Sequence, residues 1–372
     1  MTIRARTSYR AVVLIGLAVV VGVVPLPASW IEQVYSREVY LIGQPLLTSL
    51  SSLFSIALLD VLAVFGVAGL IYWWGRALCA AGQKSRMRVV SRMFLNTMAT
   101  AALLYLIFML FWGLNYRREP LVTKLDYDAT RISPALLLDF SKDTVKRLNR
   151  LHGVASSTGW PTFEELPDRF DSAFGVVQRR LGGSRMAVVG RPKETLFSPY
   201  FERAGIDGML SPFSLEVLVN HTVLPYERPF LVAHEWAHLA GYANEAEASF
   251  VGVLTCLAGD DQSQYSAWLF LLPRLVRHLS QDDRADVYAR LHEGPRQHLR
   301  EISDRLNRAV PFVRRNASRV YDRFLRANRV AEGIASYGLV VNLLMGTSGS
   351  DVWKGLLPRD DMISRVLGEN DV

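Results

Sequence analysis

The sequence predicts a mainly helical protein in which three N-terminal membrane-spanning helices precede an α+β domain with a small sheet. Long uncharged apolar runs are confined to the first 116 residues. The rest of the chain carries helical apolar patterns and a few short strand-like segments. Hydrophobic residues make up 50% of the chain, and its mean hydropathy is +0.15. These values predict a membrane domain, 1–116, and one globular domain, 117–372.

Three apolar runs are each long enough to cross about 30 Å of hydrocarbon, for which about 20 residues suffice. They predict spans over about 11–29, 53–75 and 94–114. The first run could instead be a cleaved signal peptide, because arginines precede an apolar core that ends in Pro25-Leu-Pro-Ala-Ser29. The second run contains Asp60. This acid is either a polar contact or part of a conduction path within the bundle, or it lies close enough to the interface to stay hydrated.

Basic residues gather on one side of the predicted spans, before the first run and between the second and third. The positive-inside rule places them in the cytoplasm, so the domain that follows is expected on the outer face of the cytoplasmic (inner) membrane, at the end of a multi-pass segment. Anionic lipid head groups account for this basic cluster, and the net charge of +7 therefore predicts no nucleic-acid partner. The residues are Arg4, Arg6, Arg10, Arg76, Lys84, Arg86, Arg88 and Arg92.

The segment between the first two runs, about 30–50, is amphipathic and rich in aromatic residues, which predicts a helix on the outer membrane face. The two cysteines, Cys79 and Cys256, fall on opposite sides of the predicted membrane. They are therefore not expected to form a disulfide or a cysteine metal site.

In the domain that follows, Ser133 to His152 predicts a helix with a serine cap and one apolar face. Phe163 to Leu181 predicts a second helix, which ends at a pair of glycines. Two short strands are predicted, Met186 to Gly190 and Ser214 to Asn220. The arginine-rich last third, including Asp282 to Leu306, is expected to be helical with a solvated charged face.

The pattern His234-Glu235-x-x-His238 carries the functional prediction. Pro229 suits a first helical turn and Gly241 suits the left-handed position past a helix end, so a helix of about three turns is predicted between them. Residues four apart share a helix face, and the two histidines can therefore offer ring nitrogens to one Zn²⁺. The other residues of this helix are apolar or small, which makes unpartnered polar groups costly there.

A catalytic zinc usually takes three protein ligands and leaves the fourth position to water. The longer pattern HExxHxxGxxH is not met, because Asn244 stands where its last histidine would be. Glu245 and Glu247 follow, and in a helix capped by Asn244 they point to different faces, so one of them is expected to bind. Glu235 would lie beside the metal as a general base, while zinc lowers the pKa of its bound water to about 7.

An accidental match has to be weighed against this prediction, because HExxH arises by chance in about one protein of this length in a hundred. Histidines and glutamates on one helix could also form a solvated face. The apolar residues around the motif and the acids that follow it favour a metal site.

The chain resembles a bacterial family of three-span membrane zincins that is grouped as a domain of unknown function. The resemblance implies a zincin-like α+β metallopeptidase domain with Zn²⁺ as cofactor. His234, His238 and Glu245 would be the metal ligands, because Glu245 precedes Ala248 by three residues, as the ligand does in zincins with an ExxA helix. The matching segments are 31–36, Tyr40, 112–117, Pro212-Phe213, Glu216, Asn220, 229–250, 320–328, Gly333 and 336–338.

The same resemblance suggests further roles in the site. Glu247 is the alternative ligand, or else it orients a histidine. In zincins an edge strand before the metal helix pairs with an extended substrate peptide, and here that strand would be Leu215 to Val219. Zincins also place a Tyr, His or Arg where negative charge builds on the attacked carbonyl. Tyr337 is the preferred residue for this role, and the rivals are Tyr321, Arg323, His221 and Tyr226.

The expected function is a membrane-anchored zinc metalloendopeptidase of the HExxH type. Its substrate would be a peptide or protein outside the cytoplasm. Two alternatives remain open: a zinc-binding module that holds a peptide without turnover, and a membrane scaffold or transporter that needs no metal. Neither the substrate nor the oligomeric state is predicted.

Overall fold

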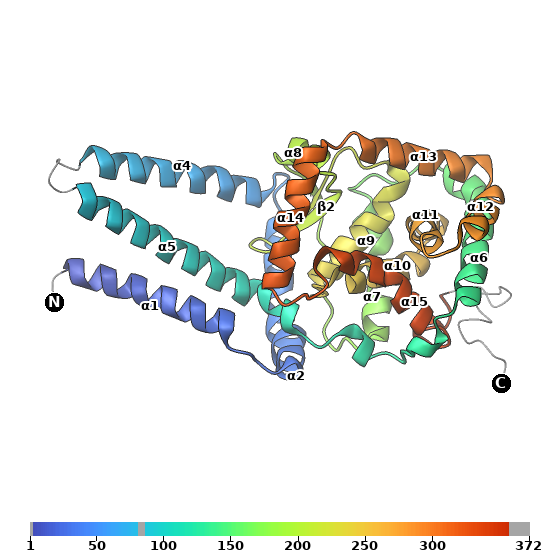
Figure 1. Ribbon diagram of the computed structural model, residues 1–372, viewed down its shortest axis with the longest axis horizontal. Helices are drawn as coiled ribbons and strands as arrows, with labels where there is room; N and C mark the ends of the chain where they lie inside the picture. The colour runs from blue at the N-terminus through green and yellow to red at the C-terminus, as the bar shows by residue number, and fades with distance from the viewer. Residues whose placement is uncertain (1–2, 81–85, 357–372) are drawn as a thin grey trace.

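The computed structural model describes residues 3–80 and 86–356, with three long apolar helices that project from one side of a helical domain (Figure 1). These helices are α1 (Ile3–Val23), α4 (Leu58–Cys79) and α5 (Arg86–Phe111). Among the described residues, α4 and α5 are each long and apolar enough to cross a membrane. A third span results if Tyr9–Val23 and Ala28–Ser52, which are bent by 106°, act as one.

The bounds of these helices differ from the predicted spans. The first helix ends at Val23 rather than near residue 29, because Pro25 and Pro27 follow and cannot continue it. The second and third helices are shifted by several residues from 53–75 and 94–114. Lys84, in the predicted basic connection, lies outside the described residues.

The segment predicted as an interfacial helix is helical, as α2 (Ala28–Trp30), η1 (Ile31–Val39) and α3 (Tyr40–Ser52). It also packs into the domain. Tyr35 and Tyr40 are buried, and the Tyr40 hydroxyl donates to the carbonyl oxygen of Leu239 at 2.8 Å. The buried polar groups of α3 likewise bond to the domain: Thr48 donates to the Leu215 carbonyl oxygen at 3.1 Å. The segment therefore contributes to the core as well as lying near the candidate spans.

The start of α4 is fixed to the sheet by two acids. Glu216 accepts hydrogen bonds from the backbone N–H groups of Leu58 (2.9 Å) and Leu59 (3.1 Å), which satisfies donors that a helix start leaves free. The buried Lys193 ammonium lies 2.6 Å from the same carboxylate. Asp60, in the first turn of α4, accepts from the Thr195 hydroxyl and the backbone N–H of residue 196. Asp60 thus anchors the helix at the domain surface.

The sheet has three strands in the order β1-β3-β2, with β1 (Pro192–Glu194) parallel and β2 (Gly208–Ser211) antiparallel to β3 (Glu216–Val219). The strand predicted at 214–220 is confirmed as β3. Its predicted position at a sheet edge is wrong, because β3 lies in the centre and β2 is the edge strand beside α9 (Arg228–Leu239). The strand predicted at 186–190 is also wrong: this segment is irregular, and the Gln44 side chain bonds its backbone at Val188.

The helices of the domain follow the predicted pattern. The first begins after Ser133, whose hydroxyl accepts from the N–H of Leu136 at 3.2 Å, as expected for a serine cap. The predicted helical stretch 282–306 is divided into two helices, with a break at residues 290–292. The helices are α6 (Pro134–Ser157), α7 (Leu166–Arg180), α8 (Ser198–Ala204), α9 (Arg228–Leu239), α10 (Glu245–Leu257), α11 (Asp261–Val276), α12 (Gln281–Ala289), α13 (Glu293–Asn307), α14 (Pro311–Ala327) and α15 (Val340–Gly346).

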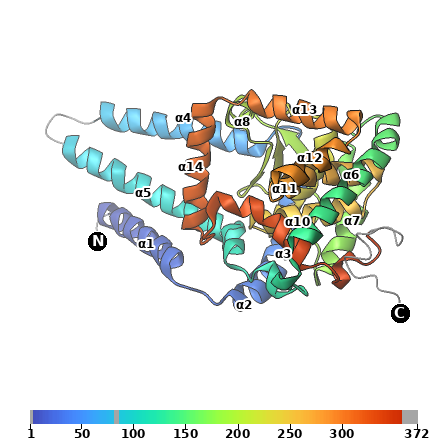
Figure 2. The same cartoon turned by 45° about the vertical axis from the view of Figure 1, so that its right-hand side comes forward.

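The helices α9 and α10 lie at the centre of the domain, and every residue of both is buried except Arg228, the first residue of α9. They pack against each other, and α7, α11 and α15 surround them. By contrast, α14 lies at the edge of the domain, across the ends of α4 and α5, in both views (Figures 1 and 2). Cys79 is exposed and Cys256 is buried, and both are free thiols.

Candidate metal centre

The helix α9 carries both histidines and is called the metal helix below. Its C-terminal end is held by groups from the segments next to the candidate spans. The Trp112 indole N–H donates to the carbonyl oxygen of His238 at 3.2 Å, and Tyr40 donates to the next carbonyl. Arg118 donates to the carbonyl oxygens of Ala240 (3.4 Å) and Gly241 (2.9 Å). Carbonyls at a helix end lack partners within the helix, so these bonds fix where the metal helix stops.

The turn after α9 requires the glycine that the sequence supplies. Gly241 has a φ of +83°, and a Cβ at this position would lie 2.9 Å from the Asn115 side-chain oxygen. Asn244 then caps α10, because its side-chain oxygen accepts from the N–H groups of Ala246 (2.9 Å) and Glu247 (3.3 Å). This cap places Glu245 in the first turn of α10. The predicted helix, turn and cap are confirmed.

Three side chains converge between the two helices. One carboxylate oxygen of Glu245, Oε2, lies 3.2 Å from Nε2 of His234 and 3.4 Å from Nε2 of His238. All three residues are buried, and their ligand atoms lie within 4.8 Å of one another. The close approach of the helices depends on Gly252, where a Cβ would lie 3.1 Å from the backbone nitrogen of His234.

The outer ring nitrogens of both histidines face other partners. Nδ1 of His238 lies 2.7 Å from the carbonyl oxygen of Tyr242, and Nδ1 of His234 lies 3.3 Å from the Ser249 hydroxyl. A carbonyl partner favours a proton on Nδ1, which leaves Nε2 free to bind a metal. Both rings thus present the nitrogen that faces Glu245.

The donors fit a divalent cation. Oε2 of Glu245 is buried and faces the Nε2 atoms of both histidines without a well-aligned hydrogen bond, and Oε2 of Glu235 is buried without a hydrogen-bond partner among the described residues. A cation between these buried groups would satisfy them. Two imidazoles and one carboxylate suit Zn²⁺ and other first-row metals. The group could therefore hold a metal ion, and its donors leave the identity of that ion open.

The charges of the group are strongly coupled. Burial lowers the pKa of His234, which favours the neutral ring that binds metals. Burial would also lower the pKa of His238, but the Glu245 carboxylate raises it to about 9. The pKa of Glu245 itself is held well below its usual range by the two histidines despite burial. A negative charge that holds a proton on His238 would also attract a cation, and binding of that cation would release the proton.

Glu235 lies beside the three ligands, between α9 and the edge strand β2. A Cβ at Gly208 of this strand would lie 3.0 Å from Oε1 of Glu235, so the backbone of β2 passes directly over the carboxylate. The Glu235 side chain is almost enclosed, with a relative exposure of 3%. Burial raises its pKa to about 8.

The other predicted site residues divide into two groups. Glu247 is not among the converging ligands, because its carboxylate accepts the backbone N–H of Leu121 at 2.5 Å. Tyr321 of α14 does reach the site, where its hydroxyl donates to Oε1 of Glu245. Tyr337 lies in η7 (Gly333–Leu339), and its side chain is outside the described residues.

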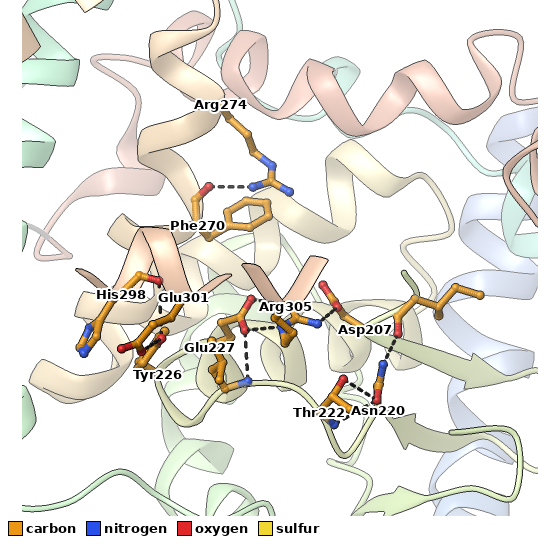
Figure 3. Close-up of polar contacts among 12 residues, drawn as sticks. Asp207, Asn220, Thr222, Tyr226, Glu227, Phe270, Arg274, His298, Glu301 and Arg305 are labelled. Atoms are coloured by element: carbon orange, nitrogen blue, oxygen red, sulfur yellow. Dashed lines mark hydrogen bonds and ion pairs between the residues drawn. The ribbon is translucent and has the colours of Figure 1, made fainter. Parts of the chain in front are cut away.

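Three rivals remain, and none of them is among the residues that contact the ligands. Arg323 is exposed on α14. His221 is exposed in the turn after β3. Tyr226 donates to the Glu301 carboxylate at 2.6 Å and stacks on His298, with ring centroids 3.9 Å apart. Both contacts of Tyr226 are made to α13, as Figure 3 shows.

The network in Figure 3 also holds the two elements beside Glu235. Arg305 of α13 donates to Glu227 at 2.7 and 2.9 Å and to Asp207 at 2.7 Å. Glu227 immediately precedes α9, and Asp207 immediately precedes β2. Arg305 therefore fixes the start of the metal helix relative to the start of the edge strand. Sequence reasoning missed this residue, because one arginine among many on a charged helix gives no signal.

Tyr116 is a second missed residue. It lies just beyond α5. Burial raises the pKa of its hydroxyl, and the nearby Glu245 charge raises it further, whereas a hydrogen bond with Tyr321 lowers it. Tyr116 therefore lies close to both Tyr321 and Glu245. It belongs to the segment 112–117, whose pattern was noticed in the sequence without a role.

Comparison with known proteins gives one match. The family model described as "Protein of unknown function (DUF3810)" matches residues 35–345, from η1 to α15, and the match includes all residues of the candidate metal centre. No curated protein and no solved structure matches the chain. Because the matched range covers most of the chain, this protein belongs to the DUF3810 family.

Proposed function

We propose that this protein is a membrane-anchored zinc metallopeptidase with a zincin-like domain on the outer side of the cytoplasmic membrane. The observation that carries the proposal is the convergence of His234, His238 and Glu245 on one point, with Glu235 one residue along the same helix and beside an edge strand. This is the residue set that hydrolysis by a metal-activated water requires.

Three residues would bind the metal, and a fourth would act as the general base. His234, His238 and Glu245 would hold Zn²⁺, which, when bound, lowers the pKa of its water and polarises a carbonyl. Glu235 would accept the proton of that water. Burial raises the pKa of Glu235 to about 8, and a cation bound beside it would lower that pKa and favour the carboxylate that a general base needs. The free edge of β2 would pair with the backbone of an extended peptide.

Access to the site is the main constraint on this proposal. Glu235 and the three ligands are all buried, and two elements cover them: β2 on one side and the Tyr321 side chain of α14 on the other. A peptide bond could approach the metal only after one of these covers moves. We expect α14 to move, because β2 is held in the sheet and by Arg305.

The enclosure also supports a second function, a zinc-binding module without turnover. In such a protein the metal would stabilise the junction of α9 and α10, and Glu235 would remain shielded. Metal content does not separate the two functions, because both bind zinc. Hydrolysis does.

The test compares peptides released from membranes that contain the parent chain, Glu235→Gln, or the exposed control Glu164→Gln. The peptidase proposal expects zinc in all three proteins, released peptides with the parent and the control, and loss of these peptides with Glu235→Gln. Equal release by the parent and Glu235→Gln would overturn the peptidase. Absence of release from all three, with zinc bound, would favour the module.

A further inference from the structure

The helix α14 lies across the ends of the candidate spans, between them and the metal helices (Figure 2). Its first and last turns both lie at the edge of the domain from which α4 and α5 project (Figure 1). A helix that crosses the ends of the spans in this way runs parallel to the membrane surface. It therefore lies at the level of the lipid head groups if α4 and α5 cross a bilayer.

The sequence of α14 suits that level. Val313, Ala317, Val320 and Phe324 are spaced so that they share one face. Val320 and Phe324 have relative exposures of 66% and 38%. The helix also carries one acid, Asp322, and five arginines: Arg314, Arg315, Arg319, Arg323 and Arg326. An exposed apolar stripe flanked by arginines is typical of helices that lie on anionic membranes.

Contacts with α5 and α1 show which way the apolar face points. The Phe324 ring lies 6.0 Å from the ring of Phe108, which is in the last turn of α5, and 5.8 Å from that of Tyr116. Just past α14, Arg329 donates to the carbonyl oxygens of Val23 and Val24 at the end of α1, both at 3.4 Å. The apolar stripe therefore continues toward the candidate spans.

The face of α14 next to the apolar stripe meets the metal centre. Leu325 is fully buried, and Tyr321, one turn earlier, donates to the ligand Glu245. The Trp112 ring, one residue past α5, lies 6.2 Å from the His238 ring. The metal ligands therefore lie directly beside the residues that follow the end of α5.

We infer that α14 docks on the anionic leaflet next to the domain, and that the metal centre acts on polypeptide segments lying at this bilayer surface. The first half rests on the position, charge and exposed face of α14. The second half rests on the proposed function, and it names the substrate class: chains anchored in or bound to the membrane, cut within a short distance of the head groups. The occupant of the α14 face is lipid, so a second copy of the chain or another protein on that face contradicts the inference.

The first experiment measures depth and does not need activity. Nitroxide labels are placed by Val320→Cys, or by Arg315→Cys on a different face of α14, in the full chain with Cys79→Ser, and the protein is reconstituted in nanodiscs with and without phosphatidylglycerol. We expect oxygen to relax the label at position 320 and a water-soluble nickel chelate to relax the label at position 315. Equal access of the nickel chelate to both labels, in variants with unchanged thermal midpoints, would overturn lipid docking.

The contribution of charge is tested in the same nanodiscs. Replacing Arg319 and Arg323 by glutamine should weaken the preference of α14 for phosphatidylglycerol by about fivefold per arginine. The matched control replaces Arg290, just past α12, and Arg300 of α13, which are exposed and lie far from the spans (Figure 1), and should change nothing. A control that lowers the lipid preference as much as the α14 pair would overturn the assignment to α14.

The second experiment tests the substrate class with one mixed-sequence peptide library, either palmitoylated at the N-terminus and bound to liposomes or left free in solution. We expect faster cleavage of the membrane-bound library by the parent and no cleavage by Glu235→Gln. Equal cleavage of both libraries would overturn the substrate class and leave the peptidase intact. If neither library is cleaved while position 320 lies in lipid, the peptidase and its substrate class fail together and the docking stands.

Discussion

Replacing Glu32 by glutamine should loosen the end of the metal helix, because Glu32 positions the arginine that holds it. The Glu32 carboxylate is buried and accepts two hydrogen bonds from Arg118, at 2.7 and 2.9 Å. Lys124 and Arg37 each lie 2.9 Å from it. Arg118 in turn donates to the carbonyls that end α9. The substitution leaves Arg118 buried without its counter-charge, which is more costly than loss of an exposed ion pair.

The pKa of Glu32 gives the magnitude. Burial alone would raise this pKa, but Arg118 and Lys124 lower it from 4.5 to about 2. The difference corresponds to about 3 kcal/mol of folding free energy, because one pKa unit is worth about 1.4 kcal/mol. For a domain of this size, that is a fall in the thermal midpoint of roughly 6–12 °C. Because the folded-state pKa is depressed, the contribution is complete above about pH 5 and is lost as the pH falls toward 2.

The assay is the thermal midpoint of the full chain in detergent, measured for the parent and Glu32→Gln between pH 3 and pH 7. The control is Glu38→Gln, whose ion pair with Arg185 is about half exposed and should contribute at most about 1 kcal/mol. At pH 3 about 1.4 kcal/mol of the Glu32 contribution should remain. A difference between the parent and Glu32→Gln that is the same at pH 3 and pH 7 would refute the electrostatic reasoning.

Three further outcomes are expected. Glu245→Gln should weaken zinc binding by at least about tenfold in equilibrium dialysis. Glu247→Gln should keep its zinc, because the amide oxygen can still accept the backbone N–H of Leu121; equal losses in the two variants would contradict the assignment of ligands. Lys193→Met should cost about 3–5 kcal/mol by denaturant unfolding, because Glu216 is left buried without its counter-charge; an unchanged midpoint would show that the pair is not needed. Gly208→Ala should cost about 1–3 kcal/mol in the same measurement, since its Cβ would lie 3.0 Å from a carboxylate oxygen of α9; a neutral effect would mean that β2 yields easily.

The local features of the metal helix could be predicted from the sequence because they depend on neighbouring residues. A proline in the first turn, a glycine past the end and an asparagine cap each act within four residues. These signals correctly predicted α9, the turn at Gly241 and the placement of Glu245. Their angular separation on one helix predicted that only one of Glu245 and Glu247 would face the histidines, and the preference for Glu245 came from the resemblance to zincins with an ExxA helix.

Features that depend on distant pairing could not be predicted in the same way. The order of the strands is set by contacts across the chain, so the central position of β3 and the edge position of β2 were missed. The segment 186–190 has the residues of a strand, yet the side chain of Gln44 takes its backbone groups. Tyr321 was named in the sequence only as a rival to Tyr337, and its hydrogen bond to Glu245 was not predicted, because the two residues are 76 positions apart along the chain.

The bonds that end α9 have a consequence for how this protein can be divided. Tyr40 and Trp112 lie before residue 117, and they bond the last carbonyls of the metal helix. A chain cut at 117 would lose both donors and the Asn115 side chain that packs against Gly241. Cleavage of the domain from the candidate spans should therefore disturb the candidate metal centre, and soluble fragments are poor material for metal-binding assays or crystallisation unless residues 28–116 are retained.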